Sequence, residues 1–223
     1  TKLVKKSLGN KIFYLSVRFI VIGICRLYLR LRIVDAHKIP KTGTFILAPS
    51  HRSTLDIPVA AATTRRRLMY MGKDSMWKRQ PLNWMLSALG AFPVTRGSAD
   101  REAIVRAIQV LKSGEPLVLF PEGERKSGPV VQPLMDGAAY VACKAGVSII
   151  PVGIGGSERV MGKGAKFIYP RKLVVIIGKP IPVPASVDGR MPRSAVKEVT
   201  TQLHEQLQML FDEAQTKVGY AAK

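Results

Sequence analysis

The chain has 223 residues, of which 47% are hydrophobic and 22% charged, a composition typical of one globular domain with a substantial core. Lysine and arginine outnumber aspartate and glutamate by 35 to 15, and the net charge of +20 favours anionic partners: nucleic acid, anionic membrane, phosphate-bearing substrates or acidic carriers. Two cysteines, Cys25 and Cys143, argue against a disulfide framework and for a reducing compartment, and three scattered histidines give little support to a zinc site.

The first 34 residues are basic and contain no acidic residue. Their apolar stretch, Ile12 to Cys25, includes one arginine and is shorter than the run of about 18 expected of a membrane-spanning helix. The basic residues of this section share an arc of roughly 120° when they are placed on a helix: Lys11, Arg18, Arg26 and Arg30. This pattern predicts a helix over residues 1–34 that lies in the membrane interface with its cations toward anionic headgroups. A core helix with a solvated basic face is the alternative.

From residue 35 to residue 223 the pattern is that of a second unit, in which short β-like runs alternate with helical runs. Strands are expected at residues 44–48, 68–72, 91–95, 116–120, 147–152 and 173–177. Helices are expected at residues 55–64, 81–89, 99–113 and 133–145, followed by a final amphipathic helix over about 194–215. This alternation predicts an α/β fold with a largely parallel central sheet flanked by helices.

A histidine and a carboxylate follow the first expected strand, in the stretch His51-Arg52-Ser53-Thr54-Leu55-Asp56. His51 can act as a general base near neutral pH, and Asp56 could hold its ring and stabilise the imidazolium. Residues five apart diverge by about 140° on one helix, so the two side chains meet only if His51 lies in the turn before the helix and Asp56 in its first turn. Ser53 and Asp56 have the spacing of a capping box, which permits this arrangement. The same spacing allows the plain alternative, in which Asp56 only caps the helix and His51 is an ordinary turn residue.

Three further stretches carry candidate residues. Residues 120–128, Phe-Pro-Glu-Gly-Glu-Arg-Lys-Ser-Gly, directly follow an expected strand, where α/β proteins build their sites, and they offer a tight glycine turn and a guanidinium suited to phosphate. Residues 90–96 form a strand that ends in arginine, and residues 147–154 form a buried strand. Each of these stretches, taken alone, is ordinary turn or core sequence.

Together and in this order, the four stretches resemble the motifs of the PlsC-like glycerophospholipid acyltransferases: H-x4-D, G-x-F-x-V-x-R, F-P-E-G-x-R and I-I-P-V, over about residues 35–185. The resemblance implies an acyltransferase domain over residues 35–223 that moves a fatty acyl group from acyl-CoA or acyl carrier protein to the free hydroxyl of lysophosphatidate, giving phosphatidate. No metal or cofactor is expected, since a thioester is already activated. The alternatives are the same chemistry on glycerol-3-phosphate, another lysophospholipid or a glycolipid, and, more remotely, a basic nucleic-acid-binding protein, for which no module is recognisable.

The resemblance also assigns roles to residues. His51 would take the proton of the acceptor hydroxyl as that hydroxyl attacks the thioester carbonyl, Asp56 would orient His51, and no acyl-enzyme would form. The implied substrate-binding residues are Arg96 and Arg125 on the acceptor phosphate, Glu122 and Gly123 shaping that site, Pro151 near the acyl or acceptor pocket, and Lys73 as a weaker phosphate contact. The expected partners are membrane lipids, the lysophospholipid acceptor and the acyl donor, not nucleic acid, and the expected location is the cytoplasmic face of the cell membrane.

One departure from the family pattern concerns the acceptor. Glu124 and Lys126 stand where the family usually has threonine and serine. A carboxylate beside a phosphate site is unfavourable unless it points away or pairs with Arg125 or Lys126.

Overall fold

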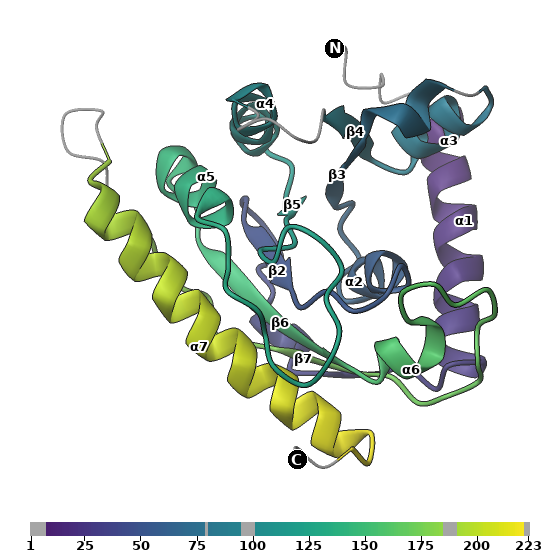
Figure 1. Ribbon diagram of the computed structural model, residues 1–223. Helices are drawn as coiled ribbons and strands as arrows, with labels where there is room; N and C mark the ends of the chain where they lie inside the picture. The colour runs from purple at the N-terminus through teal and green to yellow at the C-terminus, as the bar shows by residue number, and fades with distance from the viewer. Residues whose placement is uncertain (1–7, 79, 95–100, 185–190, 221–223) are drawn as a thin grey trace.

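A seven-stranded sheet forms the centre of the protein, in the order β1-β7-β6-β2-β5-β3-β4 (Figure 1). The computed structural model describes residues 8–78, 80–94, 101–184 and 191–220. The strands are β1 Arg32–Val34, β2 Ile46–Pro49, β3 Met69–Lys73, β4 Ala91–Val94, β5 Leu117–Val118, β6 Ile149–Gly155 and β7 Val174–Ile177. Neighbouring strands pair parallel except β6 and β7, which are antiparallel. The prediction of an α/β fold with a largely parallel sheet is therefore confirmed.

Helices cover both faces of this sheet. They are α1 Leu8–Leu27, α2 Asp56–Ala62, α3 Leu82–Ala88, α4 Arg101–Lys112, α5 Gly137–Ala145, α6 Ser157–Met161 and α7 Arg193–Lys217, with short 3-10 turns η1 Ala36–Lys38 and η2 Asp74–Lys78. One core cluster joins the sheet to α4, α5 and α7, and a second joins it to α1, α2 and α6. In Figure 1 these two groups of helices lie on opposite sides of the strands.

Several predicted boundaries differ from the structure. Strand β1 lies inside the segment predicted as a membrane helix, yet it pairs with β7, so the sheet begins before the predicted boundary at residue 34. Helix α5 begins at Gly137 rather than Pro133, because the segment before it is tied to another loop: the Met135 N–H donates to the Pro121 carbonyl at 2.9 Å. Helix α6 was not predicted. The start of the helix predicted over residues 99–113 lies outside the described residues, which resume at Arg101.

Helix α7 packs directly on β6, where the strand carries two glycines. A Cβ on Gly153 would lie 2.3 Å from the Leu210 carbonyl, and one on Gly155 would lie 2.4 Å from that of Ala214. The helix therefore approaches the strand at backbone distance, and only residues without a side chain fit between them. The final amphipathic helix is confirmed, and its buried stripe consists of Val196, Val199, Leu203, Leu207, Phe211 and Ala214.

The orientation of α1 differs from the prediction. Arg18 does not face solvent; its guanidinium donates to the carbonyls of Ala61, at 2.6 Å, and Thr64, at the C-terminal end of α2. Arg30 lies beyond the end of the helix with a φ of 45°, so it cannot share an arc with the helical cations. The predicted basic face is therefore wrong for these two residues, while the side chain of Lys11 lies outside the described part of the structure.

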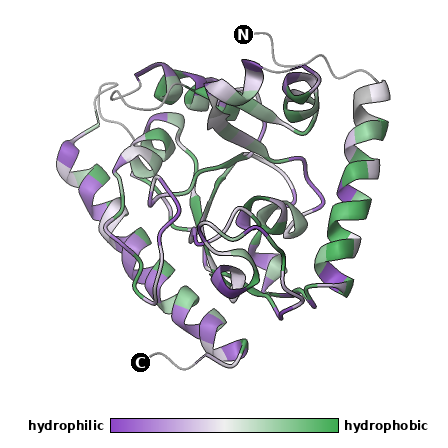
Figure 2. Cartoon of the chain, turned by 45° about the vertical axis from the view of Figure 1, so that its right-hand side comes forward, coloured by the Kyte–Doolittle hydropathy of each residue, from purple (hydrophilic) through white to green (hydrophobic). Residues whose placement is uncertain are grey.

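The outward face of α1 is apolar instead. Phe19 is 81% exposed and Leu27 is 84% exposed, and neighbouring side chains on the same helix are also largely uncovered: Ile12, Leu15, Ile20 and Ile24. In Figure 2 the helix stands at the edge of the molecule and is mostly green, the colour of hydrophobic residues. Within the described residues, no helix is both long enough and apolar enough to cross a bilayer.

Candidate active site

The candidate residues meet at the carboxyl ends of β2 and β5, which are neighbours in the sheet. The His51 turn, residues 50–55, leaves β2 and leads into α2, and residues 120–128 leave β5. Parallel strands bring the loops at their carboxyl ends to one edge, and that edge is where open α/β sheets bind ligands. Two sequence stretches about 70 residues apart are thereby brought into contact.

His51 and Asp56 form a hydrogen-bonded pair. His51 Nδ1 lies 3.1 Å from Asp56 Oδ2, with His51 in the turn and Asp56 as the first residue of α2. The same oxygen accepts the N–H groups of Arg52 and Ser53, each at 2.7 Å. Asp56 is fully buried, so these donors fix its side chain. The two side chains therefore meet in the arrangement that their spacing requires.

The capping box is only half formed. The Asp56 carboxylate accepts the Ser53 N–H, as the N3 residue of a capping box does. The Ser53 hydroxyl, however, accepts the N–H of Leu55, at 3.1 Å, rather than that of Asp56. The hydroxyl itself donates to the Met161 carbonyl at 2.6 Å. The turn is thus tied to the end of α6.

Among the described residues, the imidazole ring of His51 has a hydrogen-bond partner at Nδ1 and none at Nε2. A carboxylate accepts hydrogen bonds, so Nδ1 carries the proton in this pair and Nε2 has an open lone pair. The ring stacks on Phe120, with centroids 3.9 Å apart and planes inclined by 23°, and the side chain is 12% exposed. The orientation of the base is therefore fixed on two sides while it still reaches solvent.

A buried ion pair lies beneath the His51 turn. Arg52 Nη1 is 2.8 Å from each carboxylate oxygen of Glu122, and both side chains are almost wholly buried. The guanidinium also donates to the carbonyls of His51, Gly128 and Val130, and its carbon lies 4.8 Å from the centre of the Phe211 ring. Arg52 was not among the predicted site residues. Its position next to His51 was the available signal, but the sequence does not show which carboxylate it meets.

The segment 120–128 holds both backbone groups of His51. The His51 N–H donates to Glu122 Oε1 at 3.0 Å, and the His51 carbonyl accepts from the Lys126 N–H at 2.9 Å. Glu122 Oε2 also accepts the Gln132 N–H at 3.2 Å. Both oxygens of Glu122 are thus engaged by protein groups, which supports a positional role for this residue rather than direct contact with substrate.

Arg125 lies over the same turn. Its Nη1 donates to the Thr54 hydroxyl at 2.9 Å, and the side chain is half-buried. The neighbouring Glu124 pairs with Lys126 at 2.8 Å, which satisfies the condition under which a carboxylate is tolerated beside a phosphate site. The structure therefore brings His51, Asp56 and Arg125 together.

The remaining predicted residues are less informative. Gly123 has a φ of 75°, and a Cβ there would lie 2.5 Å from the Met135 sulfur, so the turn needs glycine. Pro151 is buried in β6 beside Ala48 of β2. Lys73 ends β3, but its side chain lies outside the described part, as does the whole of Arg96. No group of three His, Cys, Asp or Glu residues that could hold a metal occurs among the residues that the structure describes.

Comparison with known proteins agrees with this geometry. The sequence model of the family described as Acyltransferase matches residues 30–155, a range that contains β1 to β6 and the whole of the site. The chain belongs to the acyltransferase family. The acyltransferase is 28% identical over 214 residues to the 1-acyl-sn-glycerol-3-phosphate acyltransferase of Streptococcus pneumoniae, covering 94% of this chain and 77% of that protein.

Two further relatives extend the comparison. The chloroplastic 1-acyl-sn-glycerol-3-phosphate acyltransferase LPAT1 of Arabidopsis thaliana is 27% identical over 158 residues, which are 69% of this chain and 44% of that protein, so the chain spans less than half of the plant relative. The crystal structure of the acyltransferase PlsC from Thermotoga maritima superposes with a TM-score of 0.75 over 99% of this chain and 86% of that one, at 20% identity. The latter likeness establishes the shared fold.

Proposed function

We propose that this acyltransferase moves a fatty acyl group from a thioester to the free hydroxyl of 1-acyl-sn-glycerol-3-phosphate, giving phosphatidate. The observation that carries the proposal is the 3.1 Å contact between His51 Nδ1 and a buried, backbone-bonded Asp56, which leaves Nε2 as a base. The relatives named above as 1-acyl-sn-glycerol-3-phosphate acyltransferases support the substrate class.

In the proposed reaction, His51 Nε2 removes the proton of the acceptor hydroxyl as its oxygen attacks the thioester carbonyl. The Asp56 carboxylate stabilises the imidazolium that forms and keeps the ring in place. The tetrahedral intermediate then collapses, the carbon–sulfur bond breaks, and the thiolate takes the proton from Nε2. His51 returns to its starting state, and no bond forms between enzyme and acyl group.

The acceptor phosphate is assigned to arginine. Arg125 uses one nitrogen on Thr54, which places its guanidinium within the turn that carries His51, and a guanidinium presents up to five N–H donors in a planar fork. Arg96, at the end of the 90–96 stretch, is proposed as a second phosphate contact on the family resemblance. The donor is acyl-CoA or acyl carrier protein; both are anionic, and the net charge of +20 favours either.

The uncovered apolar face of α1 supports a location at the membrane surface. Bilayer insertion would remove Phe19 and Leu27 from water, while Arg18 stays bonded to α2 beneath the helix. We propose that the enzyme works at the cytoplasmic face of the cell membrane. A variant with F19S and L27S should bind anionic vesicles more weakly than the unaltered chain, and equal binding would contradict this assignment.

The acyl-transfer proposal is tested with His51→Ala. We expect kcat to fall by roughly 10²–10⁴-fold, because the base is lost, while urea unfolding stays cooperative. His37→Ala is the matched control, since that histidine is exposed and distant in sequence from the site. A folded His51→Ala variant with unimpaired turnover would refute the mechanism.

The acceptor is tested with a panel of lysophosphatidate, its dephosphorylated counterpart and glycerol-3-phosphate. Arg125→Ala should lower kcat/KM for the phosphorylated lipid by about tenfold or more, since a charge-assisted bond is lost, and should leave the low value for the neutral lipid unchanged. An equal loss on both lipids would remove Arg125 from phosphate recognition.

A further inference from the structure

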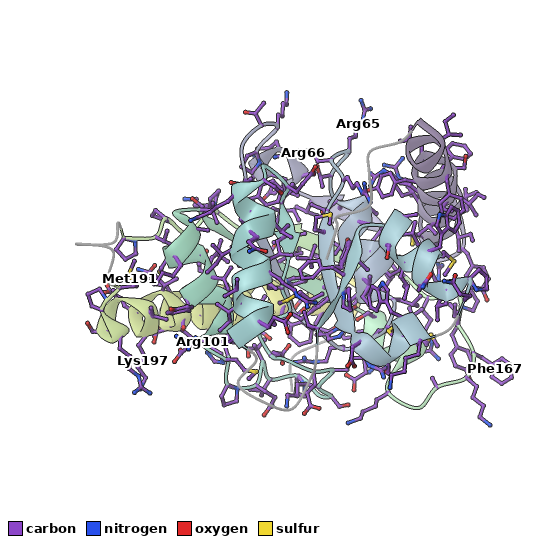
Figure 3. The ribbon with its side chains drawn as sticks, turned by 90° about the horizontal axis from the view of Figure 1, so that it is seen from above. Arg65, Arg66, Arg101, Phe167, Met191 and Lys197 are labelled. Carbon is purple, nitrogen blue, oxygen red and sulfur yellow. The ribbon has the colours of Figure 1, made fainter. Side chains whose placement is uncertain are left out.

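Residues 163–172, here called the exposed aromatic loop, lie between α6 and β7 and display apolar side chains to solvent. Phe167 is 71% exposed, and Ile168 and Tyr169 beside it are also largely uncovered. Figure 3 shows the Phe167 side chain projecting away from the body of the protein, on the side where α1 lies. Three consecutive exposed apolar or aromatic residues are unfavourable in water, so they indicate a surface that contacts something else.

The same loop is strongly basic. Four of its ten residues are cations and none is acidic: Lys163, Lys166, Arg171 and Lys172. Lys172 donates to the Lys217 carbonyl, and the guanidinium of Arg171 lies 5.9 Å from the centre of the Tyr169 ring. Cations that flank exposed aromatic rings match the two layers of a bilayer surface, in which anionic headgroups lie above an apolar interior.

Hydrogen bonds join the loop to the end of α1. The Tyr28 hydroxyl donates to the Ile168 carbonyl at 3.0 Å, and Arg30 Nη2 donates to the Pro170 carbonyl at 3.1 Å. Tyr28 directly follows Leu27, the most exposed of the large apolar residues of α1. The loop therefore lies against the end of the helix whose outward face is apolar.

The loop is also tied to the catalytic residues. It follows Met161, whose carbonyl accepts the Ser53 hydroxyl at 2.6 Å, and it is braced by the Tyr169 N–H, which donates to the Val160 carbonyl at 3.0 Å. Ser53 in turn donates its N–H to Asp56. The exposed aromatic loop thus connects the surface of α1 to the His51 turn.

We propose that the exposed aromatic loop is a second membrane contact, which inserts Phe167 and Tyr169 among the headgroups of an anionic bilayer beside α1. Two separate contacts fix the orientation of a protein on a surface, whereas a single helix lying on the surface leaves the protein free to rotate about the helix axis. Because the loop is linked to the His51 turn through Met161 and Ser53, it thereby sets the orientation of the site relative to the bilayer surface. The inference rests on the membrane location proposed above and adds the element that sets the orientation.

The test compares F167S/Y169S with the unaltered chain by sedimentation with vesicles of phosphatidylglycerol and phosphatidylcholine. We expect roughly tenfold weaker binding to the anionic vesicles, because two rings no longer leave water. Lys163→Gln and Lys166→Gln should each weaken binding to anionic vesicles by about fivefold and leave binding to pure phosphatidylcholine vesicles unchanged. Met209→Ser is the matched control, since Met209 is 65% exposed on α7, and it should bind as the unaltered chain does.

Activity measurements separate this inference from the proposed reaction. F167S/Y169S should acylate lysophosphatidate in detergent micelles at the unaltered rate and lysophosphatidate in vesicles several-fold more slowly. Unchanged vesicle binding by F167S/Y169S, or an equal loss in Met209→Ser, would overturn the inference. Absence of acyl transfer by the unaltered chain in micelles would instead refute the proposed reaction and leave the binding result standing. Failure of the unaltered chain to bind either vesicle would remove the membrane location and this contact together.

Discussion

Replacing Arg52 by methionine tests how the base is held in place. Methionine keeps much of the apolar volume of the arginine stem but leaves the Glu122 carboxylate buried without its cation. Removal of one partner from a buried ion pair costs about 3–5 kcal/mol, because the remaining charge stays desolvated. A domain of this size has a total stability of roughly 5–15 kcal/mol, so the loss is a large part of it.

Arg52 and Glu122 should be coupled energetically, because each neutralises the charge of the other. Glu122→Gln alone should cost roughly 2–4 kcal/mol, since Arg52 keeps its three carbonyl acceptors. The double variant, Arg52→Met with Glu122→Gln, removes both charges of this pair, and the glutamine oxygen can still accept the His51 N–H. We therefore expect the double variant to be more stable than Arg52→Met alone.

Equilibrium unfolding in urea measures all three variants. With a slope of about 3 kcal/mol per molar, the midpoint of Arg52→Met should fall by about 1 M or more. Lys217→Met, which removes the exposed pair with Glu213, is the control and should shift it by less than about 0.3 M. A midpoint for Arg52→Met equal to that of the unaltered chain, or a double variant less stable than both single ones, would refute the reasoning.

Three other predictions follow from packing and burial. Gly153→Ala should destabilise the protein by roughly 2–4 kcal/mol in urea unfolding, because its methyl would meet the backbone of α7, whereas Gly137→Ala, in open space at the start of α5, should be stabilising by about 0.5 kcal/mol. Gly123→Ala should lower the free energy of unfolding by roughly 1–2 kcal/mol and should also lower kcat, because a strained residue would enter the segment that holds His51. Normal turnover by this variant would contradict the prediction. Burial raises the pKa of both thiols above the ordinary value, so a thiol reagent at pH 8 should label the chain only after unfolding, and rapid labelling of the native protein would count against the burial of Cys25 and Cys143.

The alternation of apolar runs was sufficient to predict the layers of the fold, because strands and helices with different periods leave different patterns in sequence. Strand β1 was not predicted, because it has only three residues and its side chains at the sheet edge are at most partly buried. The direction of β7 was also out of reach, since a buried strand has the same apolar pattern whether its neighbour runs parallel or antiparallel.

The site was predictable to the extent that it depends on local spacing. The contact between His51 and Asp56 depends only on a turn and the start of the next helix, which lie within six consecutive residues. The Arg52–Glu122 pair depends on which strands become neighbours, and the sequence alone does not specify that β5 lies beside β2. The prediction of a basic outward face on α1 was wrong for a similar reason. Arg18 donates to carbonyls at the end of α2, and sequence periodicity does not show such a tertiary contact.

Helix α2 has the proposed catalytic pair at one end and the helix proposed to contact lipid at the other. Its first residue is Asp56, and the carbonyls at its far end receive Arg18 from α1, about 10 Å away along a rod of seven residues. In the proposed location at the membrane surface, α2 connects the helix that contacts lipid to the carboxylate that orients His51, so a change in how α1 sits in the bilayer would alter the turnover rate.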